Sequence, residues 1–305
     1  MVKKFESLMG KFIWQGSGKI LRVALDELKN DNLAGGLNLP CLTTMNNSLL
    51  SSQCLRLFRS GDEKSIAHLD FWLGSLLRDV VPGLGGGVQA VDTPDYFAHL
   101  GDCLASLLIS ELLSSSTWRT LTNKVIYRDL ADFKTPKVVS EALVDYKGVW
   151  KRLCSPVVLP DAKDVMFLLV HNKLPVPERL FRIGVRQDPY CQYCPGAEIA
   201  DVEHVFCTCE RTRECWSWIR VRILGMCDQG LLSSNWELLN LLLPRTQFEQ
   251  EVLWLVTNFV RFVWTRFSSG DSTVVFDKFF GFLTFKYKAD KRILGDMLGN
   301  IIGLN

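Results

Sequence analysis

The feature that most constrains this chain is a group of cysteines and one histidine between residues 191 and 209. Cys191 and Cys194 are separated by two residues, and His204 follows them, with further thiols up to Cys209. A two-residue gap makes a tight turn that directs both sulfurs to one point, and zinc takes thiolate and imidazole ligands together. The spacing predicts one tetrahedral zinc site. Four protein ligands leave no open position for water, so we expect the zinc to be structural.

The thiol that completes the predicted site is not fixed by spacing alone. On an unbroken helix, His204 and Cys209 would point about 140° apart, at about 100° per residue, and Cys207 would lie nearer in angle. Either His204 precedes the first regular turn and Cys209 is the fourth ligand, or Cys207 is. The competing interpretation is a set of unrelated buried cysteines, since free Cys is commonly buried. Glu198 and Glu203 lie nearby, but a closed zinc site gives a general base no water to activate.

Composition and cysteine usage indicate a core-forming protein with reduced thiols. Of the 305 residues, 48% are hydrophobic, which supports a packed core. The ten cysteines form only one dense cluster, and no secretory signal precedes them. We therefore expect a nuclear or cytoplasmic protein and not a secreted disulfide framework. The most apolar stretch, Val252–Phe267, is short and contains Asn258, Arg261 and Arg266, so it predicts a buried helix and no membrane association.

Helical periodicity dominates the sequence, and alternating strand patterns are few. We expect a mainly α fold with one or more multi-helix bundles, a small zinc-stapled subdomain and few short strands. Ile20–Leu28 fits either a short strand or a helical turn. The apolar positions predict helices over Lys3–Trp14, Thr43–Arg59, Ser65–Val81, Asp92–Leu113, Glu141–Cys154, Ala162–Asn172, Glu178–Ile183, Ser234–Leu243, Phe248–Phe267 and Phe276–Met297.

Changes of pattern along the chain predict four segments. They are residues 1–60, a helical connecting region at 61–140, the zinc-binding domain at 141–225 and a C-terminal helical region at 226–305. A glycine-rich stretch at residues 82–87 is the clearest flexible joint. It lacks the Gly-Lys-Ser/Thr ending of a phosphate-binding loop, so we assign no nucleotide to it.

Positive charge is distributed unevenly, although the net charge is only +2. Lysines and arginines exceed acids by five from Lys147 to Arg186, by three from Arg211 to Arg222 and by four from Lys278 to Arg292. Basic segments thus bracket the predicted zinc site, which favours contact with nucleic acid. Ordinary solvated helix faces are the alternative interpretation of each segment.

Several short stretches, in their order along the chain, resemble a known family. In the first half they are Phe12-Ile-Trp14, Gly35-Gly-Leu-Asn-Leu-Pro40 and Lys124–Leu130. Around the predicted zinc site they are Val149-Trp150-Lys, Phe167–Asn172, Leu174-Pro175, Arg179-Leu180, Gly184, Cys191-x2-Cys194 and His204-Val-Phe206-x2-Cys209. They resemble the C-terminal region of reverse transcriptases from LINE-type, non-LTR retrotransposons, namely the segment after the polymerase and its CCHC zinc-binding domain. The resemblance covers most of residues 1–225, is strongest over 146–218, and implies Cys209 as the fourth ligand.

The resemblance implies a non-catalytic role in binding element RNA or target DNA during target-primed reverse transcription. The family's Tyr-x-Asp-Asp signature is absent and no Asp-Asp pair occurs in the chain. We therefore expect no enzymatic activity and interpret the chain as the C-terminal third or so of a longer or decayed element. The expected partners are RNA or DNA and the polymerase part of the same element, with no small-molecule substrate. A zinc-stabilised module that binds protein and not nucleic acid is the alternative.

The candidate nucleic-acid contacts follow from side-chain chemistry. Arginine and lysine neutralise phosphates, and an exposed aromatic ring stacks on an unpaired base. Tyr193 is the stacking candidate because it lies between the paired cysteines; the alternative is that it packs on its own finger. The phosphate candidates are Lys173, Arg179, Arg182, Arg186, Arg211 and Arg213.

Overall fold

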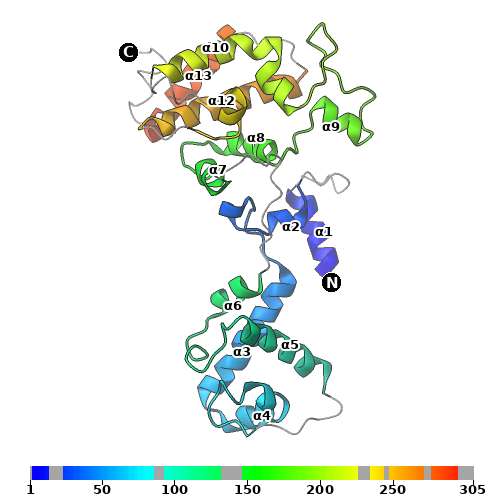
Figure 1. Cartoon of the computed structure of the whole chain (residues 1–305), viewed down its shortest axis with the longest axis vertical. Coiled ribbons are helices and arrows are strands. Elements are labelled where there is room, and N and C mark those ends of the chain that lie inside the picture. Colours follow the sequence, from blue (N-terminus) through cyan, green and yellow to red (C-terminus); the bar gives the residue numbers. More distant parts are fainter. Residues whose placement is uncertain are drawn as a thin grey trace. The chain divides into compact units, whose positions relative to one another are not determined.

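The computed structural model describes residues 2–13, 23–85, 93–131, 146–225, 234–243, 247–270 and 276–294. Over these ranges the chain is mainly α, as predicted, and the β pairing consists of an isolated antiparallel bridge between Tyr190 and Ile199. None of the helices in these ranges combines the length and the apolar character that crossing a bilayer requires. The chain forms two compact units (Figure 1): unit 1 comprises residues 1–13 and 37–134, and unit 2 comprises residues 14–36 and 135–305.

Unit 1 is a small helical bundle centred on α3 (Leu42–Ser60). Aliphatic side chains fill its core, among them Leu55, Leu73, Leu104 and Ile126. The side chain of Asp62 caps α4 by accepting a hydrogen bond from the backbone N–H of Ser65 at 3.2 Å. The other helices of this unit are α1 (Val2–Ile13), α4 (Glu63–Leu77), α5 (Asp95–Ile109) and α6 (Asn123–Leu130).

The predicted glycine-rich joint begins at Pro82, after a short turn that follows the end of α4 at Leu77. The described part of the joint is hydrogen-bonded to α4: the backbone N–H of Gly85 donates to Oδ2 of Asp70 at 3.1 Å. Residues 86 and 87 of the joint lie outside the described residues. The same holds for Trp14 at the end of the first predicted helix and for residues 141–145 at the start of another.

Unit 2 is centred on α12 (Glu249–Ser268). Every residue from Glu251 to Val260 is buried, which explains the apolar sequence of this stretch: a helix enclosed on all sides has no face for water. The predicted buried helix is therefore confirmed. The helices that pack around α12 are α8 (Pro160–Val170), α10 (Glu210–Leu224), α11 (Asn235–Leu239) and α13 (Phe276–Leu294).

One side of α10 faces this core. The ring of Trp216 lies 4.6 Å from that of Phe259 on α12, measured between ring centroids. Thr212, Ile219 and Ile223, which recur with Trp216 at helical spacing in the sequence, are also buried. The tryptophan is thus a core residue of unit 2.

A short N-terminal segment also belongs to unit 2. It contains α2 (Leu25–Leu28), so the described part of the ambiguous stretch Ile20–Leu28 is a helical turn, and the 3-10 helix η1 (Asn32–Ala34), which packs against α7 (Tyr146–Leu153). The Nε2 atom of His171 lies 2.9 Å from the carbonyl oxygen of Gly35. Residues 1–60 are therefore divided between the two units, and unit 2 continues from residue 135.

Candidate metal centre

A short hairpin positions the first two cysteines. The backbone N–H of Cys191 donates to the carbonyl oxygen of Glu198 at 2.8 Å, and the backbone N–H of Ala200 donates to the carbonyl oxygen of Pro189 at 2.9 Å. These bonds flank the bridge between Tyr190 and Ile199 and close the loop that carries Cys191 and Cys194. Ala200 also accepts from the backbone N–H of Glu178 at 3.2 Å, at the start of α9 (Pro177–Arg182). The hairpin is thereby joined to the helix that precedes it.

A wide helical turn brings the histidine and the last cysteine together. The side chain of Asp201 accepts a hydrogen bond from the backbone N–H of His204 at 2.7 Å. From there the chain forms the π-helical turn η2 (His204–Thr208), in which the N–H of Cys209 donates to the carbonyl oxygen of His204 at 2.8 Å. This is an i→i+5 bond, one residue wider than an α-turn. Cys209 therefore returns to the side of His204, which an unbroken α-helix would not allow.

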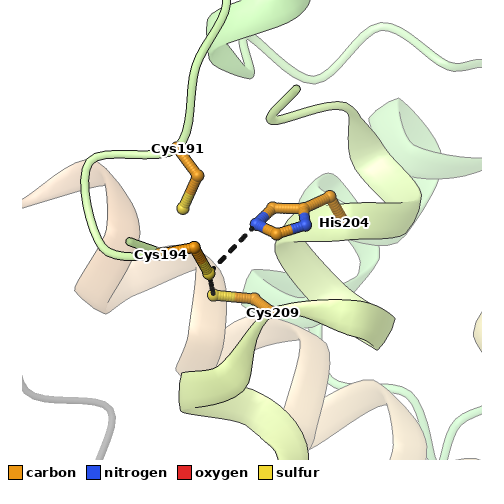
Figure 2. A group of neighbouring side chains, drawn as sticks. All are labelled: Cys191, Cys194, His204 and Cys209. Carbon is orange, nitrogen blue, oxygen red and sulfur yellow. Dashed lines mark hydrogen bonds between the residues drawn. The ribbon is translucent and has the colours of Figure 1, made fainter. Parts of the chain in front are cut away.

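The four side chains converge on one point from these two elements (Figure 2). Sγ of Cys194 lies 3.5 Å from Nε2 of His204 and 3.6 Å from Sγ of Cys209, and the four ligand atoms all lie within 4.8 Å of one another. Around a tetrahedral zinc ion with ordinary bond lengths, the sulfur–nitrogen and sulfur–sulfur separations are about 3.6 and about 3.8 Å. The donor set and its spacing therefore fit one zinc ion with four protein ligands.

The structure places Cys207 outside this group. Its side chain is half-buried, and burial, together with the neighbouring Glu203 and Asp201, raises the pKa of its thiol to about 12. Burial is also the main cause that raises the pKa of Cys209 to about 12, opposed by the backbone N–H of Arg211 and reinforced by the other two thiols. Zinc binding at Cys209 would displace that proton, because the thiolate is the ligand.

Two of the predicted nucleic-acid contacts pair with each other. The guanidinium carbon of Arg211 lies 3.6 Å from the centroid of the Tyr193 ring, and the rings of Tyr193 and Phe267 form a T-shaped pair with centroids 6.3 Å apart. Tyr193 is half-buried between the first turn of α10 and the last turn of α12. One face of the ring is therefore covered by Arg211.

Three other predicted contacts gather around one hollow. Lys173, Arg179 and Arg182 line it together with His171, Asn172 and Ile183, and its volume is about 350 Å³. Arg179 donates to the carbonyl oxygen of Asn172 at 2.8 Å, and Arg182 lies 3.6 Å from Glu178, with 61% of its side chain exposed. Burial, followed by the neighbouring Arg182, lowers the pKa of Arg179, and Glu178 opposes that shift.

The remaining two predicted contacts lie apart from this hollow. Arg186 is 3.3 Å from Asp188, and Arg213 is exposed on α10 at 3.9 Å from Glu210. Two groups beside the metal ligands have roles that the sequence did not predict: Asp201, and Glu198, which the sequence suggested only as a general base. Asp201 had a signal, because an Asp directly before a helical segment is a common N-cap, whose side chain accepts from a backbone N–H two or three residues on. The contact of Glu198 with His204 had no such signal, since it depends on the closure of the hairpin.

The fold and this site define a mainly α protein with a structural zinc centre of three cysteines and one histidine. A family model described as zinc-binding in reverse transcriptase matches residues 114–216, which include all four ligands. Searches of curated proteins and of solved structures gave no match. The family match and the geometry together support zinc binding by a protein related to reverse transcriptases.

Proposed function

We propose that the chain is a non-catalytic, nucleic-acid-binding part of a LINE-type reverse transcriptase, which holds element RNA or target DNA during target-primed reverse transcription. The observation that carries the proposal is the hollow lined by Lys173, Arg179 and Arg182. Three cations around one hollow, with Glu178 as the nearby acid, suit the phosphates of a nucleic-acid backbone. The match to a reverse-transcriptase zinc family supports the same role.

The zinc centre has a physical part in this proposal. The hydrogen bond from Glu178 to Ala200 joins α9, which carries Arg179 and Arg182, to the hairpin of Cys191. Metal binding would therefore order the hairpin and, through it, the basic helix. We assign the chain no catalysis of its own, because the paired aspartates that a polymerase uses to hold two metal ions are absent from its sequence.

The test is binding of the zinc-loaded protein to single-stranded RNA, single-stranded DNA and duplex DNA at two salt concentrations. The double variant Lys173→Glu/Arg182→Glu should weaken binding and reduce the slope of log K against log salt by about two, at about one per lost phosphate contact. The matched control is Lys64→Glu/Arg78→Glu, which reverses two exposed charges in unit 1. Equal losses in both variants, or no salt-dependent binding by the parent, would refute the proposal.

A protein-binding module is the second candidate, and a specific observation favours it. Phe181, Ile183 and Val185 follow one another around the end of α9 with 48%, 46% and 60% of their surface exposed. Exposed apolar groups of this kind are typical of protein interfaces. Association with a polymerase fragment that is insensitive to salt, with no binding to RNA or DNA, would favour this function over the first.

A further inference from the structure

The carboxylate of Glu198 contacts the nitrogen of His204 that faces away from the sulfurs. Its Oε2 atom lies 2.8 Å from Nδ1 of His204, whereas Nε2 of the same ring lies 3.5 Å from Sγ of Cys194. The imidazole therefore presents one nitrogen to a carboxylate and the other to the metal position. We propose that Glu198 is a positioning residue of the zinc centre, which accepts the Nδ1–H bond and so leaves Nε2 unprotonated for the metal.

The other neighbour of Nδ1 can either donate or accept a hydrogen bond, so a group that can only accept is needed to keep the proton on Nδ1. The hydroxyl oxygen of Thr208 lies 3.2 Å from Nδ1, and a hydroxyl either donates or accepts. If Thr208 donated to Nδ1, the ring proton of the neutral imidazole would sit on Nε2 and block the metal. An ionised carboxylate only accepts, so Glu198 selects the tautomer in which Nε2 carries the lone pair.

Glu198 also connects the two halves of the site. Its carbonyl oxygen accepts from the backbone N–H of Cys191 at 2.8 Å, while its side chain reaches His204 on the other element. The side chain of His204 is 5% exposed and that of Glu198 58% exposed, so the carboxylate lies at the rim and the imidazole inside. Glu198 thus closes the hairpin at Cys191 through its backbone and orients His204 through its side chain.

The test measures zinc affinity by competition with a chelator for Glu198→Ala, Glu198→Gln and the control Glu203→Ala. Glu203 is an exposed acid beside His204 in sequence, so its variant removes the same charge close to the site. Loss of an outer partner of a metal-bound histidine weakens metal affinity by about 10- to 100-fold. We expect a loss of this size in Glu198→Ala, a smaller one in Glu198→Gln, whose amide oxygen still accepts, and none in Glu203→Ala.

A spectroscopic measurement separates positioning from a general loss of structure. In the zinc-loaded parent, nitrogen NMR of His204 should show the metal on Nε2 and a slowly exchanging proton on Nδ1. That proton should exchange faster in Glu198→Ala and stay protected in Glu203→Ala. Equal zinc affinity in the two alanine variants, or zinc on Nδ1 in the parent, would overturn the inference. If Glu198→Ala does not fold, the near-isosteric Glu198→Gln carries the same comparison against Glu203→Gln.

Discussion

Serine substitutions at Cys209 and at Cys207 test which of these two cysteines is the fourth zinc ligand. Cys209→Ser removes a thiolate from the ligand group, whereas Cys207→Ser changes a half-buried thiol outside it. Structural zinc contributes about 10–16 kcal/mol in zinc-finger peptides, which is about 2.5–4 kcal/mol for each of four ligands if it is divided evenly. Cys209→Ser should therefore weaken zinc binding by roughly two to three orders of magnitude.

Cys207→Ser should leave zinc affinity unchanged, because its sulfur is not among the four converging atoms. This substitution should lower only the free energy of unfolding, by about 1 kcal/mol, because it places a hydroxyl in a partly apolar environment. The assays are metal content by mass spectrometry, chelator competition, and the sulfur-to-metal absorption of the cobalt-substituted protein, which reports the number of thiolate ligands. A loss of zinc in Cys207→Ser together with retention in Cys209→Ser would refute the assignment drawn from the π-turn.

Three further outcomes are expected. Zinc removal by a chelator should speed amide hydrogen exchange over residues 189–209 and leave unit 1 unchanged, because the ligands all belong to unit 2; faster exchange throughout unit 1 would contradict this. Gly36→Ala should lower the free energy of unfolding of unit 2 by several kcal/mol, because a Cβ at this position would lie 1.8 Å from the carbonyl oxygen of Asn30. The control Gly281→Ala on α13 places its Cβ where no atom lies within 4 Å, so it should raise the free energy of unfolding by about 0.5–1 kcal/mol. Thermal unfolding measures both changes. A thiol reagent at pH 8 should label exposed Cys154 well before Cys54, because burial raises the pKa of Cys54 to about 12 and so suppresses its thiolate until the pH approaches that value; equal labelling rates by peptide mass spectrometry would show that Cys54 is not buried.

Much of the helical fold was predictable because it depends on local patterns. The start of α9 follows from Pro177 at its first turn, and the buried α12 follows from an apolar stretch too short and too charged for a membrane. The proximity of Lys173, Arg179 and Arg182 could also be predicted, because these residues lie within ten positions of one another in the sequence. Features fixed by short-range geometry can be predicted in this way.

The features that could not be predicted from the sequence depend on irregular turns or on contacts between residues that are far apart in the sequence. No propensity distinguishes the π-turn at His204 from an α-turn, so residue spacing alone does not decide between Cys207 and Cys209 as the fourth ligand. The packing of Tyr193 needs Phe267, more than seventy residues away in sequence. The grouping of residues 14–36 with unit 2 likewise depends on long-range contacts such as that between His171 and Gly35.

The π-turn between His204 and Cys209 has a consequence for how the length of this segment can vary. Removal of one residue from the turn would place the histidine and the cysteine four positions apart, which an ordinary α-turn also aligns on one face. The segment can therefore lose one residue and keep both ligands on the same side by exchanging the π-turn for an α-turn. Ligand spacing in such a site is set by the width of the turn, so a segment with one residue fewer between the histidine and the cysteine can hold the same ion.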